Sequence, residues 1–374
     1  MARHHAKNER IKRAYMIWLE DAKRMAPASV NAALAAIADF EASTGHRDFA
    51  AFHHEQARAY KRRLAEAGHS ATGKPLAKAT VTARLKACHA FFVWLAGQPG
   101  YRSKINGSDA EYFNPSNHDL RIASARREKP GPSLEQVKHV IATMPASTDL
   151  EKRDRAVVAF ILLTGARDAA VASLKIRHVS VAGRFVDQDA RTVKTKNRKT
   201  IRTDFFPVGG EVEAIVLDWI AHLTGPLLFG PDDPLFPKTK VLPNAAGLFA
   251  PAGLERAHWS NAGPIRDIFK RAFPAAGQPY FNPHSLRKTL MRLAFDLGVN
   301  GEAIKAWSQN LGHEKLDTSF NSYGTVSAER QQEILAGLRS RDDRTRNNHG
   351  EPLDDETVRR ALRQFIQTGA ATAN

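Results

Sequence analysis

Apolar residues recur at helical spacing through the first hundred residues of the chain. The first stripe covers 8–25, where Ile11, Tyr15 and Leu19 fall on one face, and Pro27 is expected to end this helix. Three further helices are predicted: from a Ser29 cap to Gly45, over 49–67, and from Thr80 to Leu95. The pattern predicts a small four-helix unit with basic outer faces.

The second half of the chain mixes helical and strand-like patterns. Helices are predicted over 134–144, 155–163, 210–223 and 261–273, and Ser133 with Gln136 has the spacing of a capping box before the first of them. Segment 184–208 has strand character, with residues 192–195 and 200–201 expected to pair around a polar turn at 196–199. Residues 225–256 are Pro- and Gly-rich and predict a loop. The fold class expected is mainly α with a small β-sheet or hairpin.

A change of composition separates the two halves. Residues 97–133 are rich in Gly, Pro, Asn and charge, which predicts a linking region with a short ordered piece around Tyr112 and Phe113. We therefore expect an N-terminal helical domain over 1–125, a linker over 126–133, a second domain over 134–330 and a polar tail over 331–374. Within the tail, 357–366 has the pattern of a short amphipathic helix.

The net charge of the chain predicts the kind of partner that it binds. The 374 residues carry a formal charge of +16, and residues 1–130 account for +10 of it. A basic excess concentrated in one third of the chain favours a polyanion, and above all a nucleic acid, as the partner of the helical domain. A solvated basic surface without a partner is the alternative.

The cysteine content and the lengths of the apolar runs indicate the cellular compartment. The single cysteine, Cys88, excludes a disulfide framework and a cysteine-rich metal site, and favours a reducing cytoplasm. Residues 1–24 contain no uninterrupted apolar segment of the kind that a signal peptide needs. The longest apolar run, 156–163, has eight residues and is too short to cross a bilayer. We expect a cytoplasmic, nucleoid-associated protein with no membrane segment.

The stretch from Phe281 to Tyr323 carries the candidate chemistry. Pro283 fits the first turn of a helix, which places His284 and Arg287 three residues apart on one face at a helix start. That end of a helix presents free N–H groups and the positive end of the macrodipole, so the face suits a phosphate. Tyr323, ten residues after His313 on a polar segment, is the candidate nucleophile. Singly, each of these residues also has an ordinary structural explanation.

The order and spacing of the motifs resemble the tyrosine recombinase family, also called the phage integrase family. The residues that carry the likeness are Thr164-Gly165-Ala166-Arg167, Val193-Lys194-Thr195, His284-Ser285-Leu286-Arg287, Leu311-Gly312-His313 and Tyr323. The likeness is strong over 134–330 and weaker in the N-terminal domain, where residues 80–95 are similar to the last helix of the family's core-binding domain.

The resemblance implies a role for each of these residues. Arg167 and Arg287 would hold the phosphate, Tyr323 would attack it to form a 3′-phosphotyrosyl bond, and neither metal nor ATP would be needed. By the same resemblance His284 helps to remove the phenolic proton and His313 hydrogen-bonds the phosphate. Lys194 would protonate the leaving 5′-oxygen, although Lys196 and Lys199 on the same predicted hairpin could reach instead.

One position departs from the family's pattern, and two other signals compete with it. Family members usually have a carboxylate three residues after the first arginine, where this chain has Ala170, while Asp168 stands next to Arg167. Asp pairs at 232/233, 342/343 and 354/355 fall in predicted loops, where turns explain them better than a metal-dependent nuclease does. His pairs at 4/5 and 53/54 lack further ligands at metal spacing.

The resemblance also implies partners. We expect double-stranded DNA with inverted half-sites, a homotetramer on synapsed DNA, and an accessory directionality factor. Residues 328–366 would dock onto a neighbouring subunit, and no cofactor is expected. The candidate DNA contacts in the helical domain are Lys61, Arg62, Arg63, Lys78, Thr80 and Arg84.

A site-specific recombinase or integrase is the function that these expectations favour. A type IB topoisomerase shares the chemistry but relaxes supercoils without strand exchange. The third hypothesis is a DNA-binding relative without catalytic activity, because Ala170 stands where the family usually has a carboxylate.

Overall fold

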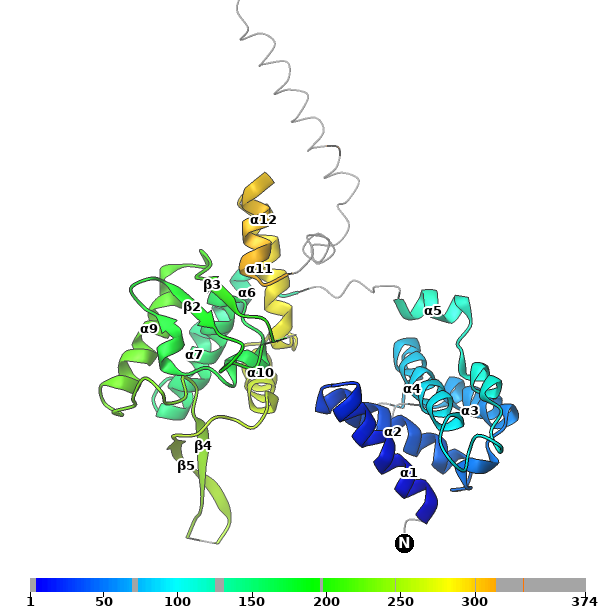
Figure 1. Ribbon diagram of the computed structural model, residues 1–374. Helices are drawn as coiled ribbons and strands as arrows, with labels where there is room; N and C mark the ends of the chain where they lie inside the picture. Colours follow the sequence, from blue (N-terminus) through cyan, green and yellow to red (C-terminus); the bar gives the residue numbers. More distant parts are fainter. Residues whose placement is uncertain are drawn as a thin grey trace, which may run out of the picture. The chain divides into compact units, whose positions relative to one another are not determined.

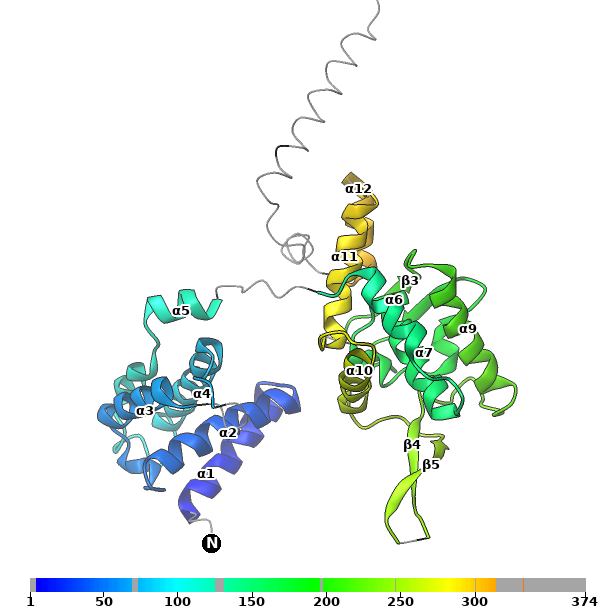
Figure 2. The same cartoon turned by 180° about the vertical axis from the view of Figure 1, so that it is seen from behind.

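The computed structural model describes residues 5–68, 73–124, 131–195, 198–245, 247–299, 301–313 and 332. The chain divides into two compact units, Met1–Arg127 and Glu128–Asn374; their helices and strands are labelled in Figure 1 and seen from behind in Figure 2. The division falls within 126–133, where the change in composition places a linker. Each unit has its own hydrophobic core.

The named elements of the first unit are all helical, and one isolated β-bridge joins Gly68 and Pro75. The longer helices of this unit are α1 (Ala6–Ile17), continued by the π-helical η1 (Trp18–Ala22), α2 (Pro27–Ser43), α3 (His54–Glu66), α4 (Lys78–Ala96) and α5 (Asn117–Ser124). Two short 3-10 segments, η2 (Phe49–Ala51) and η3 (Gly107–Phe113), connect them. The four predicted helices are all present, but their starts differ from the prediction.

Pro27 begins a helix instead of ending one. The first helical run stops at Ala22, and α2 starts at Pro27 with Ala26 as its N-cap. Proline suits this first position because its missing N–H would have no partner there, so the expected Ser29 cap is wrong. Likewise α4 starts at Lys78, with Ala77 as its N-cap, and not at Thr80.

Residues 97–124 belong to the first unit and are not a linker. Phe113 is fully buried, and its ring stacks on Phe52 at 5.6 Å and on Phe92 at 5.7 Å. Helix α5 packs on α4. The polar composition of this stretch concealed the few apolar residues that anchor it to the core.

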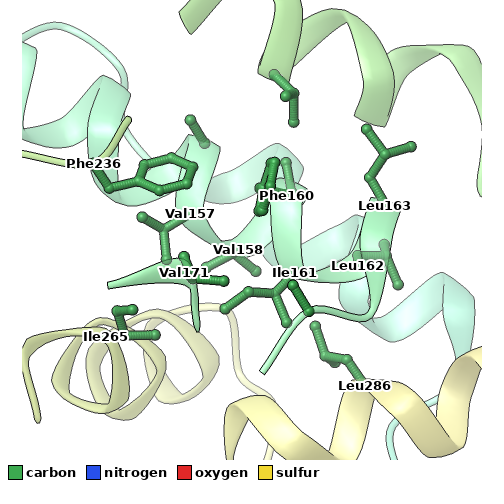
Figure 3. Close-up of a cluster of buried hydrophobic side chains, with 14 of the residues drawn as sticks. Val157, Val158, Phe160, Ile161, Leu162, Leu163, Val171, Phe236, Ile265 and Leu286 are labelled. Atoms are coloured by element: carbon green, nitrogen blue, oxygen red, sulfur yellow. The ribbon is translucent and has the colours of Figure 1, made fainter. Parts of the chain in front are cut away.

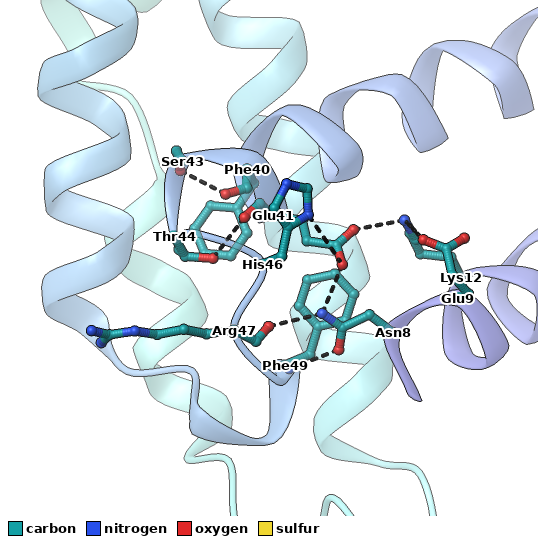
Figure 4. A network of polar contacts seen from close by, with 10 residues as sticks. All are labelled: Asn8, Glu9, Lys12, Phe40, Glu41, Ser43, Thr44, His46, Arg47 and Phe49. Carbon is teal, nitrogen blue, oxygen red and sulfur yellow. Dashed lines mark hydrogen bonds and ion pairs between the residues drawn. The ribbon is translucent and has the colours of Figure 1, made fainter. Parts of the chain in front are cut away.

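A buried polar network fixes α1 to the end of α2 (Figure 4). The Asn8 amide donates to Glu41 Oε1 and to the Arg47 carbonyl, both at 2.8 Å, and its oxygen accepts from the Phe49 N–H at 3.0 Å. Lys12 completes the network with a 2.6 Å contact to Glu41 Oε2. Both polar atoms of the Asn8 amide are thus hydrogen-bonded, and these bonds compensate the free-energy cost of burying them.

The second unit contains the remaining helices and two small sheets. Its helical segments are α6 (Leu134–Thr143), α7 (Asp149–Thr164), α8 (Asp168–Val171), η4 (Ile176–His178), α9 (Gly210–Thr224), α10 (Gly263–Ala275), η6 (Pro283–Ser285), α11 (Leu286–Asp296) and α12 (Gly301–Asn310). Its strands are β1 (Val179–Ser180), β2 (Phe185–Gln188), β3 (Ile201–Asp204), β4 (Lys238–Pro243) and β5 (Phe249–Glu255). The predicted capping box is confirmed: Ser133 Oγ accepts from Gln136 N at 3.1 Å, and Gln136 Oε1 accepts from Ser133 N at 2.9 Å.

Helix α7 forms the centre of this unit. Its residues from Ala156 to Thr164 are all essentially inaccessible to solvent, and Phe160 packs against Phe236 with ring centroids 5.3 Å apart. Figure 3 shows Ile265 of α10 and Leu286 of α11 packed against the same side of this helix. A helix that is apolar on every side must be surrounded by other elements, which explains the long apolar run in the sequence.

Both sheets differ from the prediction. The first sheet has the order β1-β2-β3, and β2 pairs antiparallel with β3 from Phe185↔Asp204 to Gln188↔Ile201. Residues 192–195 therefore lie in the connection between these strands and form no strand of their own. The second sheet, β4 with β5, lies inside the stretch that was predicted to be a loop.

Candidate functional site

The first arginine motif lies at a sharp bend after α7. Gly165 caps that helix with φ +60°, in the left-handed region, and a Cβ there would lie 2.6 Å from Leu311 Cδ2. Glycine is needed for both reasons. Arg167 follows as the half-buried N-cap of α8. The bend thus brings Arg167 close to the segment that ends in His313.

Arg287 ties three sequence motifs together. Its guanidinium is 5% exposed, Nη1 donates to the Gly165 carbonyl at 2.6 Å, and Nη2 donates to the Leu311 carbonyl. Nε is also buried and has no hydrogen-bond partner within the described part of the chain. A buried, unpaired guanidinium N–H is costly unless an acceptor reaches it, so this atom points to an anionic ligand.

Electrostatics supports the same conclusion. Burial, and then the nearby charge of Arg167, lower the pKa of Arg287 to about 9, so the side chain is still cationic at neutral pH. Two arginine charges that act on one another in a partly desolvated place favour the binding of a negative group between them.

His313 completes the cluster from the turn that follows α12. Its backbone N–H donates to Ser308 O at 3.1 Å, and Gly312 before it has φ +65°. Burial, followed by the charges of Arg287, Arg167 and His284, lowers the pKa of His313 to about 4. The ring is therefore neutral at pH 7. The charges of Arg167, His284 and Arg287 all act on this ring, so the four side chains belong to one electrostatic cluster.

His284 stands on η6, the short turn before α11. Asn282 caps this turn by accepting from Ser285 N at 3.1 Å, and the buried Pro283 occupies the first helical position. The His284 side chain is exposed while Arg287 is buried. One helix start therefore carries an exposed imidazole and, three positions later, a buried guanidinium.

Lys194 lies in the connection between β2 and β3, not on a strand as expected. Its backbone N–H donates to Ser173 Oγ at 2.9 Å, and its ammonium donates to the Ser260 carbonyl at 3.3 Å. The side chain is exposed. Of the two alternative lysines, Lys199 is exposed in the same connection, and Lys196 lies outside the described residues.

Two further expectations concern Tyr323 and Ala170. Tyr323 and, apart from residue 332, the tail lie outside the described residues. Ala170 is buried in the core, and the neighbouring Asp168 carboxylate forms a 2.8 Å ion pair with Arg266 of α10. The acid beside Arg167 is thus engaged with another helix.

Four of the six candidate DNA contacts already have partners within the first unit. Arg63 and Arg84 pair with Asp39 at 2.7 and 3.1 Å, Lys78 pairs with Asp119 at 2.8 Å, and Lys61 donates to the Asn114 carbonyl at 2.6 Å. Arg62 and Thr80 are exposed. Burial alone would raise the pKa of Asp39, but hydrogen bonds from Arg63 and Tyr60 and both guanidinium charges bring it below its usual value.

Of the three Asp pairs, the one at 232/233 has a structural explanation, and those at 342/343 and 354/355 lie outside the described residues. Asp232 pairs with Lys175 at 2.9 Å and with Arg177 at 2.6 Å, and Asp233 accepts from Gly230 N at 2.8 Å. Within the described ranges, no group of three or more His, Cys, Asp or Glu side chains could hold a metal ion. In the same ranges, none of the helices combines the length and apolar character that a bilayer crossing requires.

Sequence reasoning missed residues that act through backbone contacts. Trp307 Nε1 donates to the Leu290 carbonyl at 3.1 Å and its ring packs on Phe206 at 4.9 Å, which fixes α12 and the following His313 against α11. Ser173 and Ser260 hold Lys194. Neither serine lies in a motif, so no sequence signal could have singled it out.

Comparison with known proteins gives a family match and a fold. Residues 133–330 match the phage integrase family. No curated protein matches the chain significantly. Three similar solved structures are the Tn1549 transposon integrase with circular intermediate DNA, the XerH recombinase with a palindromic difH substrate after cleavage, and a lambda integrase dimer bound to a COC′ core site.

These three structures align over most of the chain at low sequence identity. The Tn1549 integrase has TM-score 0.56 and 14% identity and covers 87% of this chain and 98% of its own. XerH has TM-score 0.55 and 16% identity, with 84% and 81% covered. Lambda integrase has TM-score 0.54 and 13% identity, with 86% and 99% covered. At such identity the likeness establishes the fold.

Proposed function

The chain belongs to the phage integrase family of site-specific DNA recombinases, and we propose that it cuts and rejoins DNA through a covalent bond between Tyr323 and a 3′-phosphate. One observation carries the proposal: the buried guanidinium of Arg287 bridges the Gly165 and Leu311 carbonyls and leaves its buried Nε unpaired within the described residues, beside Arg167 and His313. This cationic cluster is suited to a phosphodiester.

In the proposed reaction the phenolic oxygen of Tyr323 attacks phosphorus, and the bond from phosphorus to the 5′-oxygen breaks. His284 assists removal of the phenolic proton, and Lys194 gives a proton to the departing 5′-oxygen. Arg167 and Arg287 stabilise the negative charge that builds on the non-bridging oxygens. Because one phosphate ester replaces another, the bond energy is conserved and a 5′-hydroxyl can reverse the step without ATP.

His313 is suited to bind the phosphate as a neutral ring. With a pKa of about 4 it carries an N–H donor and no charge at neutral pH. A neutral donor adds a hydrogen bond to an oxygen that two arginines already hold, and it avoids a third full charge next to Arg167 and Arg287. Bound phosphate would raise the pKa of His313, since it compensates the charges of Arg167 and Arg287.

The two units would divide the work. The family match covers the second unit, and the basic first unit is proposed to bind the duplex beside it. The solved lambda integrase is a dimer on its core site, and XerH is bound to a palindromic substrate. By analogy we assign inverted half-sites and a homotetramer to this protein, with residues 328–366 docking onto a neighbour and an accessory directionality factor setting the outcome. The proposed location is the nucleoid in the cytoplasm.

A nicked suicide substrate tests this function. DNA that flanks the coding region and contains short repeated half-sites would be nicked close to the cleavage position, so that the released strand diffuses away and the covalent complex accumulates. The wild-type protein should form an adduct that survives denaturation, and Tyr323→Phe should not. Tyr280→Phe, which changes an exposed tyrosine in the described second unit, is the matched control and should behave as wild type. An adduct with Tyr323→Phe would refute the nucleophile.

A further inference from the structure

The Lys194 backbone is hydrogen-bonded to Ser173, which lies just after α8, the short helix that has Arg167 as its N-cap. The Lys194 backbone N–H donates to Ser173 Oγ at 2.9 Å, and Ser173 Oγ donates to the Ala170 carbonyl at 2.9 Å. The Ala170 N–H in turn donates to the Arg167 carbonyl at 2.9 Å. Three hydrogen bonds therefore connect the backbone of the phosphate-binding arginine with the backbone of the lysine, although 27 positions separate them in the sequence.

Burial fixes the backbone of Lys194 but leaves its side chain mobile. Ser173 is 8% exposed, and Val193 beside Lys194 is 3% exposed and belongs to the core of the unit. The Lys194 side chain beyond this anchor is exposed and its ammonium contacts the Ser260 carbonyl at 3.3 Å. The backbone of Lys194 is thus fixed, while its long side chain can still turn towards a substrate.

Other side-chain hydrogen bonds to the segment between β2 and β3 contact residues that precede Lys194. His178 Nε2 lies 3.1 Å from Thr192 Oγ1, and its Nδ1 accepts from Lys175 N at 3.0 Å. Asp189 accepts from Arg191 N at 2.9 Å. In the described part of the chain, Ser173 is the residue whose side chain accepts a hydrogen bond from the Lys194 backbone.

We propose that Ser173 is a positioning residue for the proton donor: its hydroxyl holds the Lys194 backbone at a fixed distance from Arg167, so that the ammonium meets the leaving 5′-oxygen of the phosphate that Arg167 binds. The inference rests on the proposed function. It also gives Ala170 a part, because the carbonyl of this residue accepts the Ser173 hydroxyl where related chains usually have a carboxylate side chain.

The test compares leaving groups. An ordinary 5′-oxygen must be protonated as it leaves, whereas the sulfur of a 5′-bridging phosphorothiolate leaves as a thiolate, because a thiol is far more acidic than an alcohol. Single-turnover cleavage of both substrates would be measured for the wild type, Ser173→Ala, Lys194→Ala and the double variant. Ser173→Thr retains the hydroxyl. Ser180→Ala is the matched control, because Ser180 Oγ also accepts a backbone N–H, from Gly183 at 3.1 Å.

We expect Ser173→Ala to cleave the ordinary substrate about tenfold more slowly, a part of the loss that removal of a general acid causes. It should cleave the phosphorothiolate at nearly the wild-type rate, and the double variant should be no slower than Lys194→Ala alone. Ser173→Thr should recover most of the rate. Ser180→Ala and DNA binding by every variant should match the wild type.

Other results would overturn the inference. If Ser173→Ala is slow on both substrates, the variant has a general structural defect. If it is as fast as the wild type on both, the hydrogen bond to Ser173 is not required to position Lys194. If Lys194→Ala is slow on both substrates while the adduct still forms on Tyr323, Lys194 is not the proton donor, and the role of Ser173 fails while the recombinase function stands. If no adduct forms even with the wild type, the proposed function itself fails.

Discussion

The guanidinium of Arg287 donates to the backbone carbonyl of Gly165 over 2.6 Å, across 122 positions of sequence. The same side chain donates to the Leu311 carbonyl. A residue proposed to bind the substrate phosphate is therefore also the clamp that holds the segments of Arg167 and His313 together. Phosphate binding and the packing of these segments therefore depend on one side chain.

Arg287→Lys is expected to lower the cleavage rate by at least about 100-fold, the usual cost of losing a donor that stabilises transition-state charge. Lysine keeps the charge but cannot reach two carbonyls and a phosphate with a planar fork. The matched control is Arg292→Lys, an exposed position on the same helix, which should leave the rate unchanged. Single-turnover cleavage rates measure both. Equal rates for the two variants would contradict the assigned role.

Gly165→Ala should destabilise the second unit because two penalties combine. The left-handed backbone at φ +60° costs about 1–2 kcal/mol for a residue with a Cβ. That Cβ would also lie 2.6 Å from Leu311 Cδ2, and overpacking adds about 1–3 kcal/mol. Gly277→Ala isolates the first term, since Gly277 has φ +69° with nothing within 4 Å of its added Cβ.

Denaturant unfolding of both glycine variants measures the difference. Gly165→Ala should lose more free energy of unfolding than Gly277→Ala. Equal losses would mean that the contact between the bend and Leu311 has no energetic importance.

Local motifs could be predicted from the sequence, whereas contacts between motifs could not. His284 and Arg287 are three residues apart on one helix start, so their shared position follows from helical geometry. The acceptors of Arg287 are main-chain carbonyls, which carry no sequence signal. Residues 192–195 have strand-like side chains, but the Lys194 N–H is bonded to Ser173 and so cannot join a sheet. Strand β5 was missed because Pro251 and Gly253 interrupt it.

His313 should make the stability of the second unit depend on pH. The pKa of His313 is lowered to about 4 from its ordinary 6.5, so the unfolded chain binds a proton at this residue at pH values where the folded chain does not. Its contribution is complete above pH 6.5 and is lost as the pH falls towards 4.

Replacement of His313 by Gln should therefore reduce the loss of unfolding free energy between pH 7 and pH 5. His139→Gln, at an exposed position of α6, is the control. Denaturant unfolding at the two pH values measures the effect. An unchanged pH dependence in His313→Gln would contradict the burial of this imidazole among positive charges.

DNA binding should separate exposed from internally paired arginines. Arg62→Ala should reduce the slope of the logarithm of the binding constant against the logarithm of salt concentration by about 0.9, the value for one phosphate contact. Arg84→Ala should change this slope less and destabilise the first unit more, because it breaks a pair with Asp39 at 3.1 Å. Fluorescence anisotropy over a salt series, with thermal unfolding, distinguishes the two. The opposite ranking would place Arg84 on the DNA.

The most direct test of the central claim is to identify the residue that carries the DNA. After the suicide-substrate reaction, trypsin should release residues 316–330, which contain Tyr323 as their single tyrosine, and mass spectrometry would locate the attached nucleotide. We expect a nucleotide joined through its 3′-phosphate to Tyr323. A nucleotide on any other peptide, or one joined through a 5′-phosphate, would contradict the claim.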